Sequence, residues 1–458
     1  MNKLSKSESH DPNYLAVVTT IPEIKEHPNA NKLSLVEIFG NTIVIGKDSY
    51  KAGAKVIYFP VECCIDAEFL SWANLFDRPE LNQDGKTKGF FSPKGCRVKA
   101  VRLREVASQG FLLPAFEAAK YFKIKEEDFV ADESFDMANG KVFVKKYQRP
   151  LSPAQAPPKF KKSRLPVWLD KTLGVLPKPV RRLVAPAIHS YYEPKSESFK
   201  TLIVENQFSF HYKTEHLGRN IFLVDPEDVV TIGVKAHGTS SIFSNILCYD
   251  KQNWISKLLK IPRKSSYKFI YSSRSIIKNR HDGKFSDDVW GSEAAKLQGR
   301  IPPGYTVYGE IVGHTPSGKA VQKGYDYGVG AGLSELWVYR ITHVDKEGNK
   351  EEFNFSEIRD FALTHGLKTV PIYYHGAAED LFDIPIDGNF GKVFLSKLKE
   401  KYLDKYCEFC KNKVIGEGIV LKNNSRFGRP ALKYKSESFS IEESKNRDKG
   451  VVDMEEES

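Results

Sequence analysis

Hydrophobic residues in the first part of the chain, from Tyr14 to about Ala118, fall into short runs separated by Gly, Asn, Asp and Pro. β-Branched and aromatic residues dominate these runs, which read LAVVTTI, SLVEIFG, NTIVIG, KVIYFP, CRVKAVRL and GFLLPA. Runs of this kind with turn residues between them predict β-strands. Several short strands in succession predict a small β-barrel.

Part of this region also resembles known sequences. The stretch HPNANKLSLVEIFG followed by KDSYKAGAKVIYFP resembles the opening of OB-like modules, including those of tRNA-binding proteins. We therefore expect residues 14–137 to form an OB-like barrel. Such a barrel often binds oligonucleotides with one face and its loops, but it can also be a scaffold only, and the sequence leaves both possibilities open.

Residues 138–197 have a different composition and are interpreted as a linker. Proline is mixed with lysine and arginine between Gln148 and Pro194, as in RPLSPAQAPPKFKKSRLP, and proline at this density favours extended segments over long regular elements. The basic residues either contact phosphate or are simply solvated, and we favour the second interpretation. They are Lys159, Lys161, Lys162, Arg164, Arg181 and Arg182.

From residue 198 to 440, strand-like and helix-like patterns alternate. Strands are predicted by DVVTIGVKA, SIFSNIL, KFIYSS, YTVYGEIVG, ELWVYRITHV, GIVLK and ALKYK, and helices by SDDVWGSEAAKLQGR, NFSEIRDFALTHG and KVFLSKLKEKYL. This mixture predicts an α+β domain with antiparallel sheets. Residues 441–458 are polar, and we expect this tail to fray.

Charge and composition narrow the functional classes. The net charge of +11 over 458 residues favours an anionic partner, because lysines and arginines that neutralise phosphates gain from counterion release. No apolar run approaches the 18 or so residues of a membrane span, and the N-terminus lacks the apolar stretch of a signal peptide, so we expect a cytoplasmic protein. We also expect it to be a monomer. Cys407 and Cys410 form a CxxC without a second matching pair, which favours reduced thiols over a zinc site.

The segment GVKAHGTSSIF carries the first candidate for chemistry. Lys235 lies between two predicted strands, and Gly238 would let the backbone approach a phosphate. A lysine so placed can attack the α-phosphate of a nucleotide. The KxxG tetrad alone is weak support, because an exposed lysine before a turn is a common feature.

Further segments follow in a definite order, and together with KAHG they resemble the superfamily of polynucleotide ligases and mRNA capping enzymes. The resemblance covers the whole C-terminal domain. It implies that Arg274 of YSSRSIIKN contacts phosphate, that Glu310 of YGEIVG contacts the ribose or a metal, and that Tyr339 of LWVYRI stacks on adenine. It also implies that Glu417 of EGIVLK is a metal ligand, and that Lys433 and Lys435 of ALKYKS contact the phosphates of the nucleotide.

The arrangement of the modules and several short segments resemble a family of RNA ligases typified by the Deinococcus enzyme. The OB-like module precedes the domain, a short polar tail follows Lys435, and FSFHYKTEHLGRNI, KAHG and GYDYG all resemble that family. His237 stands where many relatives have an acidic residue, and we expect it to contact the nucleotide, although it could instead pack beside Lys235. The long proline-rich linker and the CxxC depart from the family pattern.

The resemblance implies an ATP-dependent RNA ligase that uses Mg²⁺ or Mn²⁺ and joins 3′-hydroxyl to 5′-phosphate ends at breaks in duplex or bridged RNA. The alternatives are a DNA ligase with the same chemistry and a non-catalytic RNA-binding protein with a degenerate transferase domain. From the OB-like pattern we further expect that removing the N-terminal module spares lysine adenylation and impairs sealing.

Overall fold

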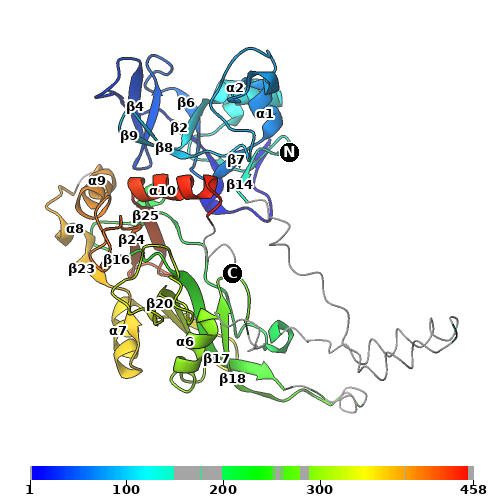
Figure 1. The fold of residues 1–458 in the computed structure, drawn as a ribbon, viewed down its shortest axis with the longest axis vertical. Helices are drawn as coiled ribbons and strands as arrows, with labels where there is room; N and C mark the ends of the chain where they lie inside the picture. Colours follow the sequence, from blue (N-terminus) through cyan, green and yellow to red (C-terminus); the bar gives the residue numbers. More distant parts are fainter. Residues whose placement is uncertain are drawn as a thin grey trace.

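Two parts make up the computed structural model, an N-terminal module and a larger C-terminal domain on which it lies (Figure 1). The structure describes residues 3–148, 199–250, 261–278, 288–386 and 388–451, with the single positions 177, 252 and 259. Most of the expected linker, with all six of its basic residues named above, lies outside the described residues. No helix in these described segments is long and apolar enough to cross a bilayer.

Short antiparallel strands build the N-terminal module. Its central sheet has the order β10-β6-β2-β11, and two further groups, β3-β4-β5 and β8-β9, contact each other through β5 and β9. Their bounds are β2 (Ala16–Thr20), β3 (Ile24–Glu26), β4 (Leu33–Ile38), β5 (Asn41–Gly46), β6 (Lys55–Phe59), β8 (Ala100–Leu103), β9 (Val106–Gln109), β10 (Phe111–Pro114) and β11 (Ser134–Phe135). The short helices α1 (Ala67–Trp72) and α2 (Ala115–Phe122) complete a core rich in phenylalanine.

The module extends beyond the predicted boundary at residue 137. The strand β12 (Met137–Ala138) pairs with β1 (Leu4–Ser5) and β13 (Lys141–Val142), and β14 (Val144–Lys146) pairs with β7 (Cys63–Ile65). Residues 138–146 therefore belong to the module and not to the linker. The sequence pattern missed these strands because each has only two or three residues.

Two sheets form the C-terminal domain, and nearly all of their strand pairs are antiparallel, as predicted. One sheet has the order β15-β25-β24-β16-β23, and the other β18-β17-β19-β20-β21, with β22 parallel to β20. The first contains β15 (Glu215–His216), β16 (Val229–Val234), β23 (Ile372–Ala377), β24 (Gly418–Asn423) and β25 (Ala431–Lys435). The second contains β17 (Thr239–Tyr249), β18 (Ser265–Ser273), β19 (Tyr305–Gly313), β20 (Ser334–Val344), β21 (Lys350–Glu352) and β22 (Lys368–Thr369).

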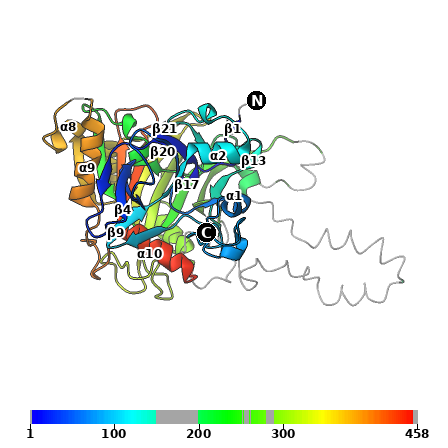
Figure 2. The same cartoon turned by 90° about the horizontal axis from the view of Figure 1, so that it is seen from above.

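Helices cover the two sheets through separate apolar cores. Helices α6 (Val289–Leu297) and α7 (Phe355–Thr364) pack on the second sheet, whereas α9 (Phe390–Tyr402), beside the short α8 (Ala378–Leu381), packs on the first. The predicted α+β class is confirmed. Seen from above, the N-terminal module lies over the C-terminal domain (Figure 2).

The polar tail does not fray where it was expected to. Helix α10 (Glu437–Asp448) follows β25 and lies between the N-terminal module and the C-terminal domain (Figure 1). It buries Ser440, Ile441 and Ser444 and packs against β8 and β9. The prediction of a frayed tail from residue 441 is therefore wrong as far as Asp448, because the partner surface that orders this helix belongs to a distant part of the chain.

Candidate active site

Lys235 lies directly after β16, at the end of a buried strand. Its backbone N–H donates to the carbonyl of Gly418 at 2.9 Å, which continues the ladder between β16 and β24 by one residue. Its Nζ lies 2.7 Å from Oε1 of Glu417, the residue just before β24. The two sheet strands therefore fix both the main chain and the amine of this lysine.

The turn after Lys235 is held by three further hydrogen bonds. The N–H of His237 donates to the Tyr327 hydroxyl at 2.6 Å, and the N–H of Gly238 donates to Oε1 of Glu310 at 3.1 Å. Gln322 donates to the Gly238 carbonyl at 2.9 Å. A Cβ on Gly238 would lie 2.3 Å from the carbonyl oxygen of Ile311, so close backbone approach requires glycine at this position.

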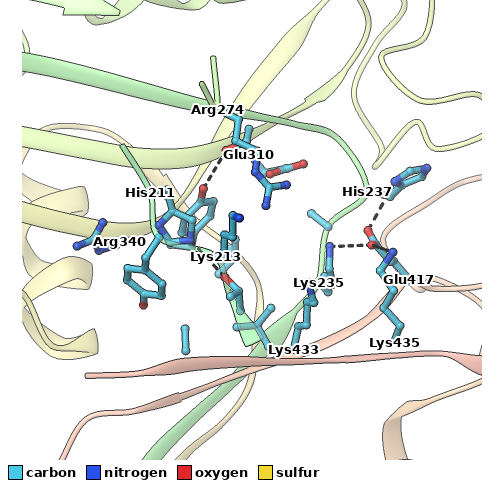
Figure 3. A pocket seen from close by; sticks show the side chains of 18 of the residues that line it. His211, Lys213, Lys235, His237, Arg274, Glu310, Arg340, Glu417, Lys433 and Lys435 are labelled. Atoms are coloured by element: carbon cyan, nitrogen blue, oxygen red, sulfur yellow. Dashed lines mark hydrogen bonds and ion pairs between the residues drawn. The ribbon is translucent and has the colours of Figure 1, made fainter. Parts of the chain in front are cut away.

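Glu417 is the buried acid around which the cations gather. Besides Lys235, its carboxylate meets Nζ of Lys435 at 3.3 Å and Nδ1 of His237 at 3.6 Å (Figure 3). Burial by itself would raise the pKa of Glu417, but the charges of Lys235, Lys435 and His237 outweigh it and hold the pKa below its ordinary value. Glu417 is therefore ionised at neutral pH.

Lys433 and Lys435 are neighbours on β25 but have opposite electrostatic environments. Burial, together with the positive charges of Lys435, Lys235 and Arg274, lowers the pKa of Lys433 to about 7. Burial opposes the charge of Lys435 as well, but Glu443 and Glu417 raise its pKa above the ordinary value. Lys435 is thus a permanent cation, whereas Lys433 can take up a proton when an anion arrives.

The charged side chains described above line one cavity of about 1100 Å³. Of the residues singled out in the sequence, it brings together Lys235, His237, Arg274, Glu310, Tyr339, Glu417, Lys433 and Lys435, and Gly238 lies at its edge through its bond to Glu310. The hydroxyl of Tyr339 lies 3.3 Å from Oγ of Ser240, and its ring centroid lies 5.1 Å from that of His211, with the ring planes tilted by 60°. Apolar side chains, among them Val338, Val370, Ile372 and Val420, line another part of the wall.

The sequence interpretation missed several residues of this wall. Asp11, Tyr14 and Lys146 reach the cavity from the N-terminal module, and Lys213 lies 3.4 Å from Asp11. Sequence spacing could not place them there, because only the folded contact between the two parts brings them to the cavity. Glu443 and Arg447 were hidden in a segment interpreted as a polar tail.

Arg340 and Lys422 form a second buried cationic group at the cavity. The guanidinium of Arg340 lies over the rings of Tyr212 and Tyr308 at 4.7 and 4.4 Å, and it pairs with Glu352 at 2.8 Å. Burial lowers the pKa of Lys422 to about 8. Arg340 directly follows Tyr339 and was overlooked, because a charged residue in a strand is usually exposed.

Residues 228–435 match the family model described as RNA ligase. Residues 15–115 match a model described as an OB-fold domain, which agrees with the expected N-terminal module. No curated protein matches the chain.

Solved structures of the RNA ligase of Naegleria gruberi are similar over almost their whole length. A point mutant with AMP and Mn has a TM-score of 0.53 and 15% identity, and the match covers 93% of this chain and 98% of that one. The form with PPi has a TM-score of 0.52 and 16% identity, with 95% and 100% covered. At this identity, the likeness establishes a shared fold across both parts of the chain.

Proposed function

We propose that this protein is an ATP-dependent RNA ligase in which Lys235 carries AMP. The observation that supports this most directly is the position of the Lys235 amine. It lies at the end of β16, is paired with Glu417, and faces a cavity lined by Arg274, Lys433 and Lys435. A lysine nucleophile among fixed cations suits attack on a phosphate and the release of an anionic leaving group.

The first step would form a bond between Nζ of Lys235 and the α-phosphorus of ATP. The bond from that phosphorus to the pyrophosphate oxygen breaks, and pyrophosphate leaves. The Lys235 ammonium would lose one proton before it attacks and a second as the N–P bond forms, to the Glu417 carboxylate 2.7 Å away and from there to solvent. Lys433, Lys435 and Arg274 would offset the charge on the phosphate oxygens. The apolar wall near Tyr339 would take the adenine.

Two further steps complete the proposed reaction. The 5′-phosphate of a broken strand attacks the lysyl-AMP phosphorus, which releases the Lys235 amine and forms an adenylylated end. A 3′-hydroxyl then attacks the phosphorus of the 5′-phosphate and expels AMP. The order of the parts, with an OB-fold module ahead of the transferase domain, agrees with the Deinococcus type of RNA ligase and supports RNA as the substrate.

The carboxylates at the cavity suit a divalent ion. Glu310 and Glu417 supply hard oxygen ligands of the kind that Mg²⁺ and Mn²⁺ prefer, and phosphate oxygens and water would complete the shell. Among the residues that the structure describes, no three His, Cys, Asp or Glu side chains form a metal cluster. Such an ion would supply charge neutralisation at the transferring phosphate.

Incubation with ATP labelled at the α-phosphate tests the proposal. We expect labelled protein in the presence of Mg²⁺ or Mn²⁺, no label from γ-labelled ATP, and no label in Lys235→Ala. Lys392→Ala is the matched control, because this lysine lies exposed on α9, away from the cavity, and should leave labelling unchanged. Unlabelled wild-type protein would instead support an RNA-binding protein without catalysis.

Sealing assays then separate RNA from DNA ligation. Duplexes with one nick are prepared with a ribose or a deoxyribose at the terminal 3′ nucleotide and are otherwise identical. We expect sealing with the ribose and strongly reduced sealing with the deoxyribose. Equal rates on both would defeat the RNA-specific part of the proposal and leave a general nick-sealing ligase.

A further inference from the structure

Helix α10 carries two charged residues that connect the N-terminal module to the active site. The side chains of Glu443 and Arg447 lie one turn apart and are 3.4 Å from each other, between Oε1 and Nη2. They occupy the side of the helix that lines the cavity. Neither residue belongs to the segments that suggested the chemistry.

These two residues are the middle of a continuous series of ion pairs. Glu62 of the N-terminal module meets Nη1 of Arg447 at 3.0 Å, and Glu443 meets Nζ of Lys435 at 3.0 Å. Lys435 then meets Glu417 at 3.3 Å, and Glu417 meets Lys235 at 2.7 Å. The series runs from a residue of the first module to the nucleophile through contacts no longer than 3.4 Å.

Glu62, the residue of the N-terminal module at which the series begins, is held by several hydrogen bonds. Glu62 is buried, and Arg97 donates to both of its carboxylate oxygens at 2.8 and 2.7 Å. The hydroxyl of Ser444, the residue after Glu443 on α10, donates to Glu62 at 2.6 Å. A buried carboxylate with this many donors is fully compensated and has little freedom to move.

The backbone of Glu62 gives independent support. Its φ is +68°, a left-handed conformation that a non-glycine residue rarely adopts. Its N–H donates to the carbonyl of Val98, and its carbonyl accepts from the N–H of Tyr147, at 2.8 and 3.0 Å. Conformations of this kind persist where surrounding structure enforces them, often at functional sites.

We propose that Glu62, Arg447 and Glu443 are positioning residues for lysine adenylation, which act through Lys435 and Glu417 on Lys235. The inference rests on the proposed function of Lys235. Glu443 pairs with the ammonium of Lys435. Because Lys435 has this second acidic partner, Glu417 can also pair with the Lys235 amine. Glu62 and Arg97 fix Arg447, and Arg447 in turn fixes Glu443.

This proposal changes the expectation for the N-terminal module. The sequence pattern suggested that adenylation does not depend on it. Since Glu62 contributes to the series that holds Lys435, we now expect the first chemical step to depend on the contact between the module and α10. The test can be made with point variants of the full chain, so that neither part has to fold alone.

The experiment measures single-turnover formation of lysyl-AMP from α-labelled ATP over a range of ATP concentrations. The variants are Glu443→Gln, Arg447→Met and Glu62→Gln, with Arg447→Lys as the conservative change. Glu442→Gln and Lys445→Met are matched controls, because both residues are exposed on the same helix. Thermal unfolding of each variant identifies those that remain folded.

We expect the rate constant at saturating ATP to fall about 10- to 100-fold in the first two variants, because a displacement of about 1 Å at a reacting centre can cost ~100-fold. Half-saturation by ATP should change little, and Arg447→Lys should recover part of the rate. The Glu62→Gln, Arg447→Met double variant should lose no more than the worse single variant, as expected for two residues that act through one contact.

Three results would overturn the inference. Folded variants of the series could adenylate as fast as the wild type, or the matched controls could lose as much rate, or the whole loss could appear in ATP half-saturation. If Glu62→Gln does not fold, Arg447→Met and Glu443→Gln still decide the question. Absence of label in the wild type would be a different outcome, because it would defeat the proposed function itself.

Discussion

Lys433 and Lys435 lie two residues apart on β25, and we predict that replacing each by methionine changes stability in opposite directions. Burial and neighbouring cations lower the pKa of Lys433 from its ordinary 10.5 to about 7. At about 1.4 kcal/mol per pH unit, this difference corresponds to about 5 kcal/mol as an upper bound. Protonated Lys433 therefore destabilises the folded protein relative to the unfolded chain, in which the same ammonium is solvated.

Proton linkage gives the direction in which Lys433 makes stability depend on pH. Between pH 7 and 10.5 the unfolded chain keeps the proton of Lys433 and the folded chain releases it, so the folded protein becomes more stable as the pH rises through this window. Lys433→Met removes the penalty, and we expect it to stabilise the protein by about 1–3 kcal/mol at pH 7, allowing for relaxation around the site. This gain in stability should shrink by roughly 2 kcal/mol between pH 7 and pH 9, which removes most of it.

Lys435→Met should do the reverse. Its raised pKa comes from Glu443 and Glu417, and removing the cation leaves both acids buried without it. Breaking a buried pair in this way costs about 3–5 kcal/mol. Because Lys435 is protonated in both the folded and the unfolded state from pH 7 to 9, Lys435→Met should destabilise the protein equally at pH 7 and pH 9.

Urea unfolding at pH 7 and pH 9 measures the change in stability caused by each of the two variants. Labelling with ATP shows whether both variants also lose adenylation. The comparison is well matched, since both changes replace a lysine on the same strand by the same residue. Destabilisation by Lys433→Met, or a gain that does not shrink with pH, would refute the electrostatic account of this site.

Three further predictions concern single contacts. Gly238→Ala should destabilise the protein by about 1–3 kcal/mol and slow adenylation, because its Cβ would lie 2.3 Å from the Ile311 carbonyl; unfolding and labelling assays check both effects. Tyr434→Phe removes the 2.8 Å bond to the Gly40 carbonyl across the two parts and should cost about 1 kcal/mol in urea unfolding. His216 is buried with a pKa lowered to about 3, so stability should fall by roughly 2 kcal/mol from pH 7 to 5, and His216→Phe should flatten this slope.

Much of the C-terminal domain could be predicted because its strands are long and their apolar residues are local signals. YTVYGEIVG coincides with β19, and the predicted segments around β16, β17 and β20 overlap the observed ones. Lys235, Arg274 and Glu417 lie directly beside strand ends, whereas Glu310 and Tyr339 lie within β19 and β20. The order of these motifs along the chain placed them near one another. Pairing of β16 with β24 then accounts for the contact between Lys235 and Glu417.

Helix α10 shows why the rest could not be predicted. Its sequence ESFSIEESKNRD has few apolar residues, and the pattern alone is that of a solvated tail. What orders it is a set of charged and hydroxyl contacts with Glu62 and Arg97, more than three hundred residues earlier in the chain. A local pattern carries no information about a partner that only folding brings near.

The same contacts bear on how the proposed reaction would proceed. Oε1 of Glu417 is shared by the amines of Lys235 and Lys435 in the resting structure. When Nζ of Lys235 bonds to phosphorus it loses its positive charge, and Glu417 loses one of its two lysine partners. Lys435 would then be drawn further toward Glu417 and away from the phosphate unless another acid restrained it. Glu443 is that acid, and its link through Arg447 to Glu62 makes the N-terminal module part of the device that keeps Lys435 in place through the change of charge.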